Sequence, residues 1–239
     1  SIKGTLTEML NYLTGDIWSF EFRERGYSNN ERTYQKNKHY FRKSVRIIDT
    51  EDFCMLSGGL DSYIGAIDLL KEGKHPIFVG NYNGGKGVCL YQNEVIKSLS
   101  QHFQYPKDYF YQYYAAPLSG VENTTRSRSF MFFSHAILLA SGMRHEVRLC
   151  IPENGVISLN IPLTIHRCGS LSTRTTHPYY MNRLREILKQ LEIPVILYNP
   201  YQFATKGEMI SACKDLDFLK ATYSLTMSCS HPDQERWKG

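Results

Sequence analysis

Short apolar runs alternate with helical patterns along most of this chain, and this alternation limits its fold more than any other feature. The runs are rich in β-branched and aromatic residues, as buried strands are, while the intervening segments carry apolar residues at helical spacing. We expect strands at residues 53–56, 77–79, 109–114, 147–151 and 195–198, and helices at residues 60–70, 88–103, 130–140, 184–191 and 206–213. This order predicts an α/β fold, with a doubly wound, mostly parallel sheet covered by helices on both faces.

The first fifty residues have a different character. A short amphipathic start is followed by residues 17–23, in which apolar and polar side chains nearly alternate, and we expect a half-buried strand there. Eight basic and three acidic residues lie between Glu21 and Arg46, so this segment carries the whole excess of the +5 net charge. We attribute this charge to a solvated face beside aromatic packing residues; an anionic partner surface is the alternative.

Composition excludes several classes of protein. With 239 residues, 42% hydrophobic and 21% charged, the chain has the balance of a folded globular protein and not of a disordered one. No apolar run approaches the roughly 18 residues of a membrane span, and the first 20 residues do not resemble a signal peptide. The six cysteines form no C-x-x-C pair and indicate buried thiols in a reducing compartment. We therefore expect a cytoplasmic protein with no membrane partner.

The turn after the first predicted strand carries the clearest chemistry. It reads SGGLDS, residues 57–62, and stands where a buried strand gives way to a helix. Adjacent glycines let the backbone approach an oxyanion closely, and the free N–H groups and dipole of a helix start attract negative charge. We expect the anion-binding residues to be Ser57, Gly58, Gly59, Asp61 and Ser62. The alternative is a plain glycine turn followed by a helix cap.

In its context, the string SGGLDS resembles the PP-loop, SGGxDS, of the N-type ATP pyrophosphatases. No G-x-x-x-x-G-K-[ST] motif occurs, so the resemblance implies ATP cleavage between the α and β phosphates and not γ-phosphoryl transfer. It also implies the adenine nucleotide α-hydrolase-like (HUP-type) version of the α/β fold. ATP and Mg²⁺ are the implied cofactors, with Asp61 acting through the metal.

Three further strings resemble motifs of the 7-cyano-7-deazaguanine synthase family, QueC. Residues 205–209, TKGEM, resemble the K-x-E motif that brings a lysine, here Lys206, to the phosphates; a surface lysine in a first helical turn is the alternative. Arg128, just before an apolar helix, resembles the arginine of an R-N-x-x-F-x-S segment, and the resemblance implies a substrate contact. Residues 226–231, TMSCSH, resemble the stretch with the first zinc cysteine, which makes Cys229 a candidate zinc ligand whose partners lie beyond the chain end.

The interval 153–177 lacks the YPDCR-type string of QueC, and its sequence resembles that of the QueC-like proteins of anti-phage defence, in the Qat system (QatC) and type IV CBASS. The resemblance covers about residues 50–239, and we expect residues 1–49 to be part of an N-terminal extension. Within the interval, we expect Arg174, Thr176 and His177 to contact the substrate. A capping or packing role for His177 stays open. Since the chain starts at Ser1 without methionine and ends at Gly239 without an obvious finish, we suspect a fragment.

The family resemblance implies an ATP-dependent carbon–nitrogen ligase. Its substrate would be a carboxylate of the 7-carboxy-7-deazaguanine type, which is adenylated and then attacked by an amine. Asp61 and Lys206 are the implied catalytic residues. In QueC the amine is ammonia; for the defence branch we expect an amine of a protein partner from the same defence operon. The resemblance also allows a homodimer.

Two other functions stay open. One is a tRNA-modifying PP-loop enzyme, for which the basic segment before Arg46 could meet phosphates, although we recognise no RNA-binding module and do not expect direct binding of nucleic acid. The other is a non-catalytic, nucleotide-sensing subunit of a defence complex. The complete SGGLDS string shows no sign of lost catalysis, so the enzyme is the reading we adopt.

Overall fold

A computed structural model describes residues 1–37, 48–82, 86–115, 127–143, 145–159 and 174–228. Its strands are β1 (Asp52–Met55), β2 (Ile77–Tyr82), β3 (Phe110–Tyr114), β4 (Val147–Cys150) and β5 (Val195–Tyr198). The helices that cover the sheet are α1 (Ile2–Thr14), α4 (Leu60–Lys71), α5 (Lys86–His102), α6 (Arg128–Ala140), α8 (Pro178–Gln190), α9 (Lys206–Ser211) and α10 (Leu216–Thr222). Shorter or separate elements are α2 (Asn29–Lys36), α7 (Gly155–Leu159) and the 3-10 turns η1 (Lys107–Tyr109), η2 (Ser141–Met143) and η5 (Tyr223–Leu225).

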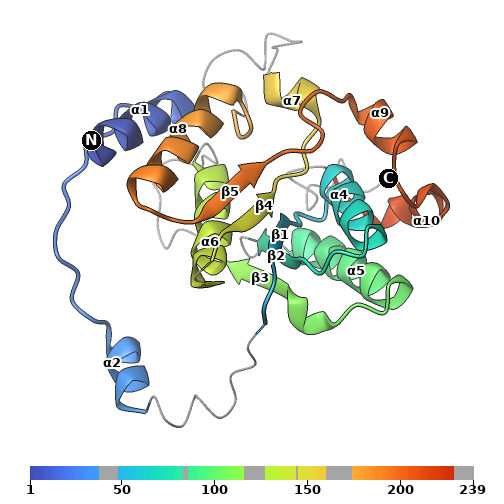
Figure 1. The fold of residues 1–239 in the computed structure, drawn as a ribbon, viewed down its shortest axis with the longest axis horizontal. Coiled ribbons are helices and arrows are strands. Elements are labelled where there is room, and N and C mark those ends of the chain that lie inside the picture. The colour runs from blue at the N-terminus through green and yellow to red at the C-terminus, as the bar shows by residue number, and fades with distance from the viewer. Residues whose placement is uncertain (38–47, 83–85, 116–126, 144, 160–173, 229–239) are drawn as a thin grey trace.

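The five strands form one sheet in the order β3-β2-β1-β4-β5, and every neighbouring pair is parallel (Figure 1). The chain first moves outward from β1 to β3 and then returns to the other side of β1 to form β4 and β5. This reversal creates a topological switch point between β1 and β4, where ligands of such sheets bind outside the carboxyl ends of the strands. The predicted α/β fold with a parallel, two-faced sheet is confirmed.

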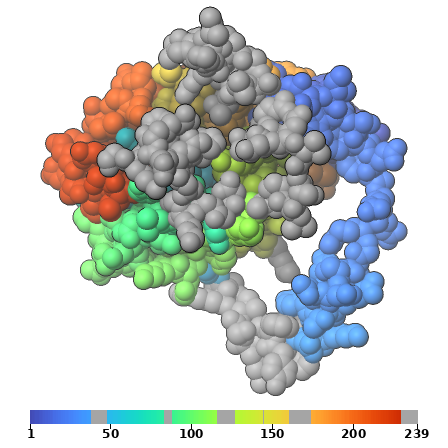
Figure 2. Space-filling model, turned by 180° about the vertical axis from the view of Figure 1, so that it is seen from behind, coloured from blue at the N-terminus to red at the C-terminus, as the bar shows by residue number. Residues whose placement is uncertain are grey.

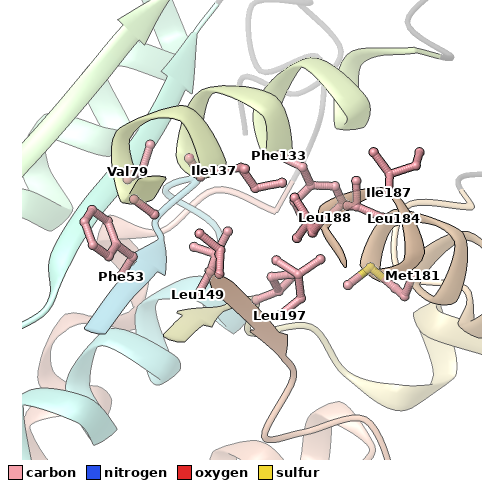
Figure 3. Close-up of a cluster of buried hydrophobic side chains, with 14 of the residues drawn as sticks. Phe53, Val79, Phe133, Ile137, Leu149, Met181, Leu184, Ile187, Leu188 and Leu197 are labelled. Atoms are coloured by element: carbon pink, nitrogen blue, oxygen red, sulfur yellow. The ribbon is translucent and has the colours of Figure 1, made fainter. Parts of the chain in front are cut away.

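Alternation of side chains along the strands separates two cores. Phe53 of β1 points to a cluster formed with α1, α6 and α8, and its neighbour Cys54 points to a cluster formed with α4, α5, α9 and α10. Figure 3 shows side chains from α6 and α8 meeting over Leu149 of β4 and Leu197 of the edge strand β5. Helices therefore cover both faces of the sheet, as the two-sided apolar character of the strands requires.

Helix α1 belongs to the first of these cores. Its residues Met9, Leu10 and Leu13 are buried in the cluster, and α1 lies side by side with α8 (Figure 1). We expected residues 1–49 to be part of an N-terminal extension. The first helix of that segment nevertheless contributes side chains directly to the core on one face of the sheet.

The strand expected at residues 17–23 is wrong. These residues follow α1 without regular structure, and the Trp18 N–H donates to a side chain of that helix, Asn11 Oδ1, at 2.8 Å. The Trp18 ring stacks on Phe20 at 5.8 Å, and both pack against the core. With no strand beside it, an alternating pattern has no ladder to join. Beyond it, α2 buries no residue and stands apart from the sheet (Figures 1 and 2).

Candidate functional site

The glycine turn leaves β1 in a conformation that requires its first glycine. Gly58 has φ of +88°, and a Cβ there would lie 3.1 Å from Gln92 Cγ. Gln92 is buried beneath the turn, where its Nε2 donates to the carbonyl of Ser57 at 3.1 Å and to that of Asn81 at 2.9 Å. The turn is therefore held from below by an amide side chain of α5, and its N–H groups are left for its outer side.

Serine hydroxyls occupy several of these N–H groups. The N–H of Ser57 donates to Ser62 Oγ at 3.2 Å, and that of Gly59 donates to Ser57 Oγ at 3.3 Å. The N–H of Leu60 donates to Ser228 Oγ at 3.4 Å. The N–H groups of Gly58, Asp61 and Ser62 make no hydrogen bond to a described residue, as is usual in a first helical turn. An anion could replace the hydroxyls and meet several donors at once.

Asp61, in the first turn of α4, joins the two sides of the switch point. Its Oδ2 accepts from Asn154 twice, from the backbone N–H at 3.2 Å and from Nδ2 at 2.6 Å. Its Oδ1 lies 3.0 Å from the ammonium of Lys206 and accepts from no other described group. The Asp61 side chain is 10% exposed and that of Lys206 is 39% exposed, so the lysine reaches a buried carboxylate from the solvent side.

Lys206 is held by the start of its helix. It is the first residue of α9, which is capped by Thr205: the Thr205 hydroxyl accepts from the N–H of Glu208, and the Glu208 carboxylate accepts from the N–H of Thr205. This capping box fixes the first turn of a helix only six residues long. The lysine stem is thereby anchored while its ammonium stays half-exposed.

The loop before α9 is tied to α4 by a second buried carboxylate. Asp68 accepts from the Tyr201 hydroxyl at 2.6 Å and from the N–H of Lys214 at 2.8 Å. Burial raises the pKa of Tyr201, and its contact with Asp68 raises it further. Residues on both sides of α9 are thus attached to the helix that carries Asp61, which fixes the distance between Asp61 and Lys206.

Glu153 adds a second carboxyl beside Asp61. It follows β4, and its backbone is held by Asn199, which accepts from the Glu153 N–H and donates to its carbonyl at 2.7 Å. Burial raises the pKa of Glu153 to about 7; the Asp61 charge adds to this and the Lys206 charge opposes it. With this pKa, the Glu153 carboxyl titrates near neutral pH, and it interacts electrostatically with both Asp61 and Lys206.

A polar network lies at the carboxyl end of β2. Asn81 is buried, and its Oδ1 lies 2.6 Å from His135 Nδ1. The His135 ring stacks on Tyr113 at 4.7 Å, and burial lowers the pKa of this histidine. Gln112 Nε2 donates to Gln92 Oε1 at 3.2 Å and links the network to the glycine turn. These polar side chains all belong to one edge of the sheet.

Thr176, Arg174 and His177, which were expected to bind substrate, separate into two places. Thr176 is buried and accepts from the Ser158 hydroxyl at 3.1 Å. Arg174 donates to the carbonyl of Tyr12 and lies 4.8 Å above its ring. His177 caps α8, accepting from the Tyr179 N–H at 3.2 Å, and its ring lies 5.1 Å from that of Tyr12. Arg174 and His177 thus attach α8 to α1 and do not meet Asp61 or Lys206.

Arg128 begins α6, which leads from the carboxyl side of the sheet back to the start of β4. Its guanidinium lies 5.4 Å from the Phe132 ring, and burial lowers its pKa. It forms no ion pair with any described residue. Helix α6 packs on the face of the sheet opposite to α4 and α9, so Arg128 and Asp61 begin helices on different faces.

Residues 226–228 lie against the glycine turn. The Met227 N–H donates to the carbonyl of Gly58 at 2.9 Å, and Ser228 reaches the start of α4. Cys229 itself lies outside the described residues, as do residues 160–173 of the long interval. Within the described ranges, no group of three or more His, Cys, Asp and Glu side chains could hold a metal ion. Nor is any helix in those ranges long and apolar enough to span a membrane.

The structure brings together the predicted anion-binding and catalytic residues Ser57, Gly58, Gly59, Asp61, Ser62 and Lys206. Two residues of the site were not predicted from the sequence: Asn154, which holds Asp61, and Gln92, which holds the glycine turn. Polar residues directly after the fourth predicted strand were the available signal for Asn154; nothing in the local sequence marks Gln92. Comparison with protein-family models, curated proteins and solved structures finds no match for this chain.

Proposed function

We propose that this chain is a QueC-like PP-loop ATPase that adenylates a carboxylate and passes the activated acyl group to an amine. The observation that carries the proposal is the contact between Lys206 and Asp61, 145 positions apart in sequence, with their charged atoms at 3.0 Å. Both residues had been singled out through the same family resemblance, and both stand at the switch point where ligands of such sheets bind.

The glycine turn fits a nucleotide triphosphate. Gly58 adopts a positive φ, and helix α4 starts here with N–H groups of Asp61 and Ser62 that make no hydrogen bond to a described residue. Asp61 would repel a phosphate directly, but one carboxylate together with phosphate oxygens is a usual set of Mg²⁺ ligands. A Mg²⁺ ion held by Asp61 would neutralise charge on the pyrophosphate leaving group.

Each residue then has a defined task. Ser57, Ser62 and the free N–H groups of the turn hold the β and γ phosphates, so that the α phosphorus faces the incoming carboxylate. Lys206 leaves Asp61 and turns to the phosphates, where its charge stabilises the negative charge that develops as the bond to pyrophosphate breaks. Asn154 keeps the Asp61 carboxylate in place when the lysine moves.

The acid is a carboxylate of the 7-carboxy-7-deazaguanine type, and the amine that attacks the acyl adenylate is ammonia or an amine of a protein partner from an anti-phage defence operon. This part of the proposal rests on the family resemblance of residues 153–177 and 226–231. Zinc binding by Cys229 belongs to the same proposal.

The reaction is tested by separating the nucleotide products after incubation of the protein with ATP, Mg²⁺ and 7-carboxy-7-deazaguanine, with and without ammonium. We expect AMP and pyrophosphate as products. We also expect Lys206→Ala to form AMP at least about 100-fold more slowly than the wild type. The matched control is Lys220→Ala, an exposed lysine of α10. Release of ADP and phosphate, or equal rates in the two variants, would contradict the proposal. Intact mass of the operon partner after the same incubation tests protein ligation; an unchanged mass excludes it.

A further inference from the structure

A cavity of about 460 Å³ lies between α7, the first turns of α8 and the loop from β5 to α9. These three elements stand along one edge of Figure 1, with α7 between α8 and α9. The volume is in the range of small-molecule sites. Neither Asp61 nor Lys206 lines it, so it is a space separate from the glycine turn.

One wall of the cavity is shared with the Asp61–Lys206 contact. Gly155 and Thr205 line the cavity, and they directly follow Asn154 and directly precede Lys206. The Gly155 N–H donates to the carbonyl of Ala204 at 2.8 Å, and a Cβ on Gly155 would lie 2.4 Å from the Gln202 carbonyl oxygen. The loop after β4 and the loop before α9 are therefore in direct contact. A molecule in the cavity would touch Gly155 and Thr205, which are the sequence neighbours of Asn154 and Lys206, the two partners of Asp61.

The lining suits a planar ring with polar edges. Val156, Leu159 and Met181 offer apolar contact, and the Phe203 ring is 92% exposed, which leaves a free aromatic face beside the cavity. Asn182 and Gln202 bring side-chain amides that can bind the edge of a heterocycle.

Arg185 supplies the charged end of the cavity. Its guanidinium donates to the carbonyl of Leu197 and to Asn182 Oδ1, and no carboxylate among the described residues pairs with it. Burial lowers its pKa, as expected for a cation that lacks an anionic neighbour. A carbonyl oxygen on the ring of a ligand would give this cation a further acceptor.

We propose that this cavity holds the ring of the acid that is adenylated, a planar heteroaromatic carboxylate of purine size. Its ring carbonyl lies toward Arg185, and its carboxylate lies at the rim beside Gly155 and Thr205, the residues next to Asn154 and Lys206. This inference rests on the proposed function for the role of the ligand, whereas the site itself rests on the cavity, its lining and its shared wall.

The test uses binding and not only turnover. Calorimetry with 7-carboxy-7-deazaguanine, and separately with ATP and Mg²⁺, is carried out on the wild type, on Leu159→Trp inside the cavity and on Leu138→Trp on α6. The two leucines are 58% and 68% exposed, so neither change disturbs a core. We expect Leu159→Trp to weaken binding of the acid by about tenfold or more and to leave binding of ATP within about twofold, while Leu138→Trp changes neither. Asn182→Ala, which removes an amide of the lining together with its hydrogen bond to Arg185, should also weaken binding of the acid.

The outcomes separate the two proposals. If the wild type binds the acid in the cavity but forms no AMP, the proposed function fails and the cavity proposal stands. If the wild type forms AMP and Leu159→Trp and Asn182→Ala bind the acid as tightly as the wild type, the cavity proposal is overturned and the proposed function stands. A wild type that binds no acid overturns the cavity proposal as well.

Discussion

Gly65 of α4 and Pro152, just after β4, approach so closely that a Cβ on Gly65 would lie 2.4 Å from Pro152 Cγ. This contact sets how near α4 comes to the end of β4. Asp61 stands one helical turn before Gly65, and Asn154 stands two residues after Pro152, so the same contact decides whether the carboxylate reaches its amide. The glycine is therefore a packing requirement of the candidate site.

Gly65→Ala should destabilise the protein by about 1–3 kcal/mol, because the added methyl group forces the helix and the loop apart. An alanine in an open helical position would instead stabilise it by about 1 kcal/mol. Urea unfolding measures the difference. The control is Gly4→Ala in α1, where the new Cβ would lie 3.5 Å from its nearest neighbour, Ser1 Oγ, and should be neutral or stabilising. Equal effects of the two changes would contradict this reading of the contact.

Gln92 is the support of the glycine turn. Gln92→Leu keeps its volume but leaves the carbonyls of Ser57 and of the buried Asn81 without this donor, which should cost about 2 kcal/mol or more. The turn would lose its lower anchor, so we also expect weaker binding of ATP with Mg²⁺ in calorimetry.

The neighbouring Asn93→Leu is the control for Gln92→Leu, since Asn93 is exposed and its side-chain amide donates to Cys89 Sγ within the same helix. If the two variants unfold at the same urea concentration and bind ATP equally, Gln92 does not support the turn.

Local patterns were enough to predict the sheet elements. The run from Val195 to Tyr198 is a strand with those bounds, and the helix expected from Leu60 ends at Lys71 just before Gly73, whose φ is +73°. Buried parallel strands are continuous apolar runs, and their signal needs no knowledge of their neighbours. The same logic failed at Ile17–Arg23, where alternation was present but no strand lay beside it.

The partners of the site could not be predicted in the same way. Asn154 reaches Asp61 only because β4 lies next to β1, although β2 and β3 come between them in sequence. The order of strands in a sheet depends on the packing of the whole chain, so it cannot be predicted from a short local sequence motif. Arg174 and His177, which were expected at the substrate, both lie against Tyr12, because α1 packs beside α8; their local sequence does not indicate this contact.

Met9 tests the contribution of α1 to the core. It is fully buried beneath the sheet, so Met9→Ala should lower the free energy of unfolding by about 2–5 kcal/mol through lost contacts and a cavity. Leu138→Ala on α6, a residue 68% exposed, is the control and should change it by less than about 0.5 kcal/mol. A Met9→Ala protein as stable as this control would mean that α1 is a detachable appendage in solution.

Glu153 should make the stability of the protein depend on pH in an unusual direction. Burial raises the pKa of Glu153 from 4.5 to about 7, with Asp61 adding to the rise and Lys206 opposing it. Between these two values the folded protein holds a proton that the unfolded chain releases, so stability falls as pH rises through this window. Most carboxyls in folded proteins act in the opposite sense.

Glu153→Gln removes this titration and keeps the shape of the side chain. The variant should match the wild type near pH 4 and become more stable than it above pH 7, by up to roughly 3 kcal/mol at 1.36 kcal/mol per pKa unit. Urea unfolding at pH 4.5, 6 and 8 measures this difference, with Glu146→Gln, an exposed carboxyl before β4, as the control for the loss of one negative charge. A difference between Glu153→Gln and the wild type that stays constant from pH 4.5 to 8 would show that Glu153 is ionised throughout and that Asp61 does not have a protonated neighbour at neutral pH.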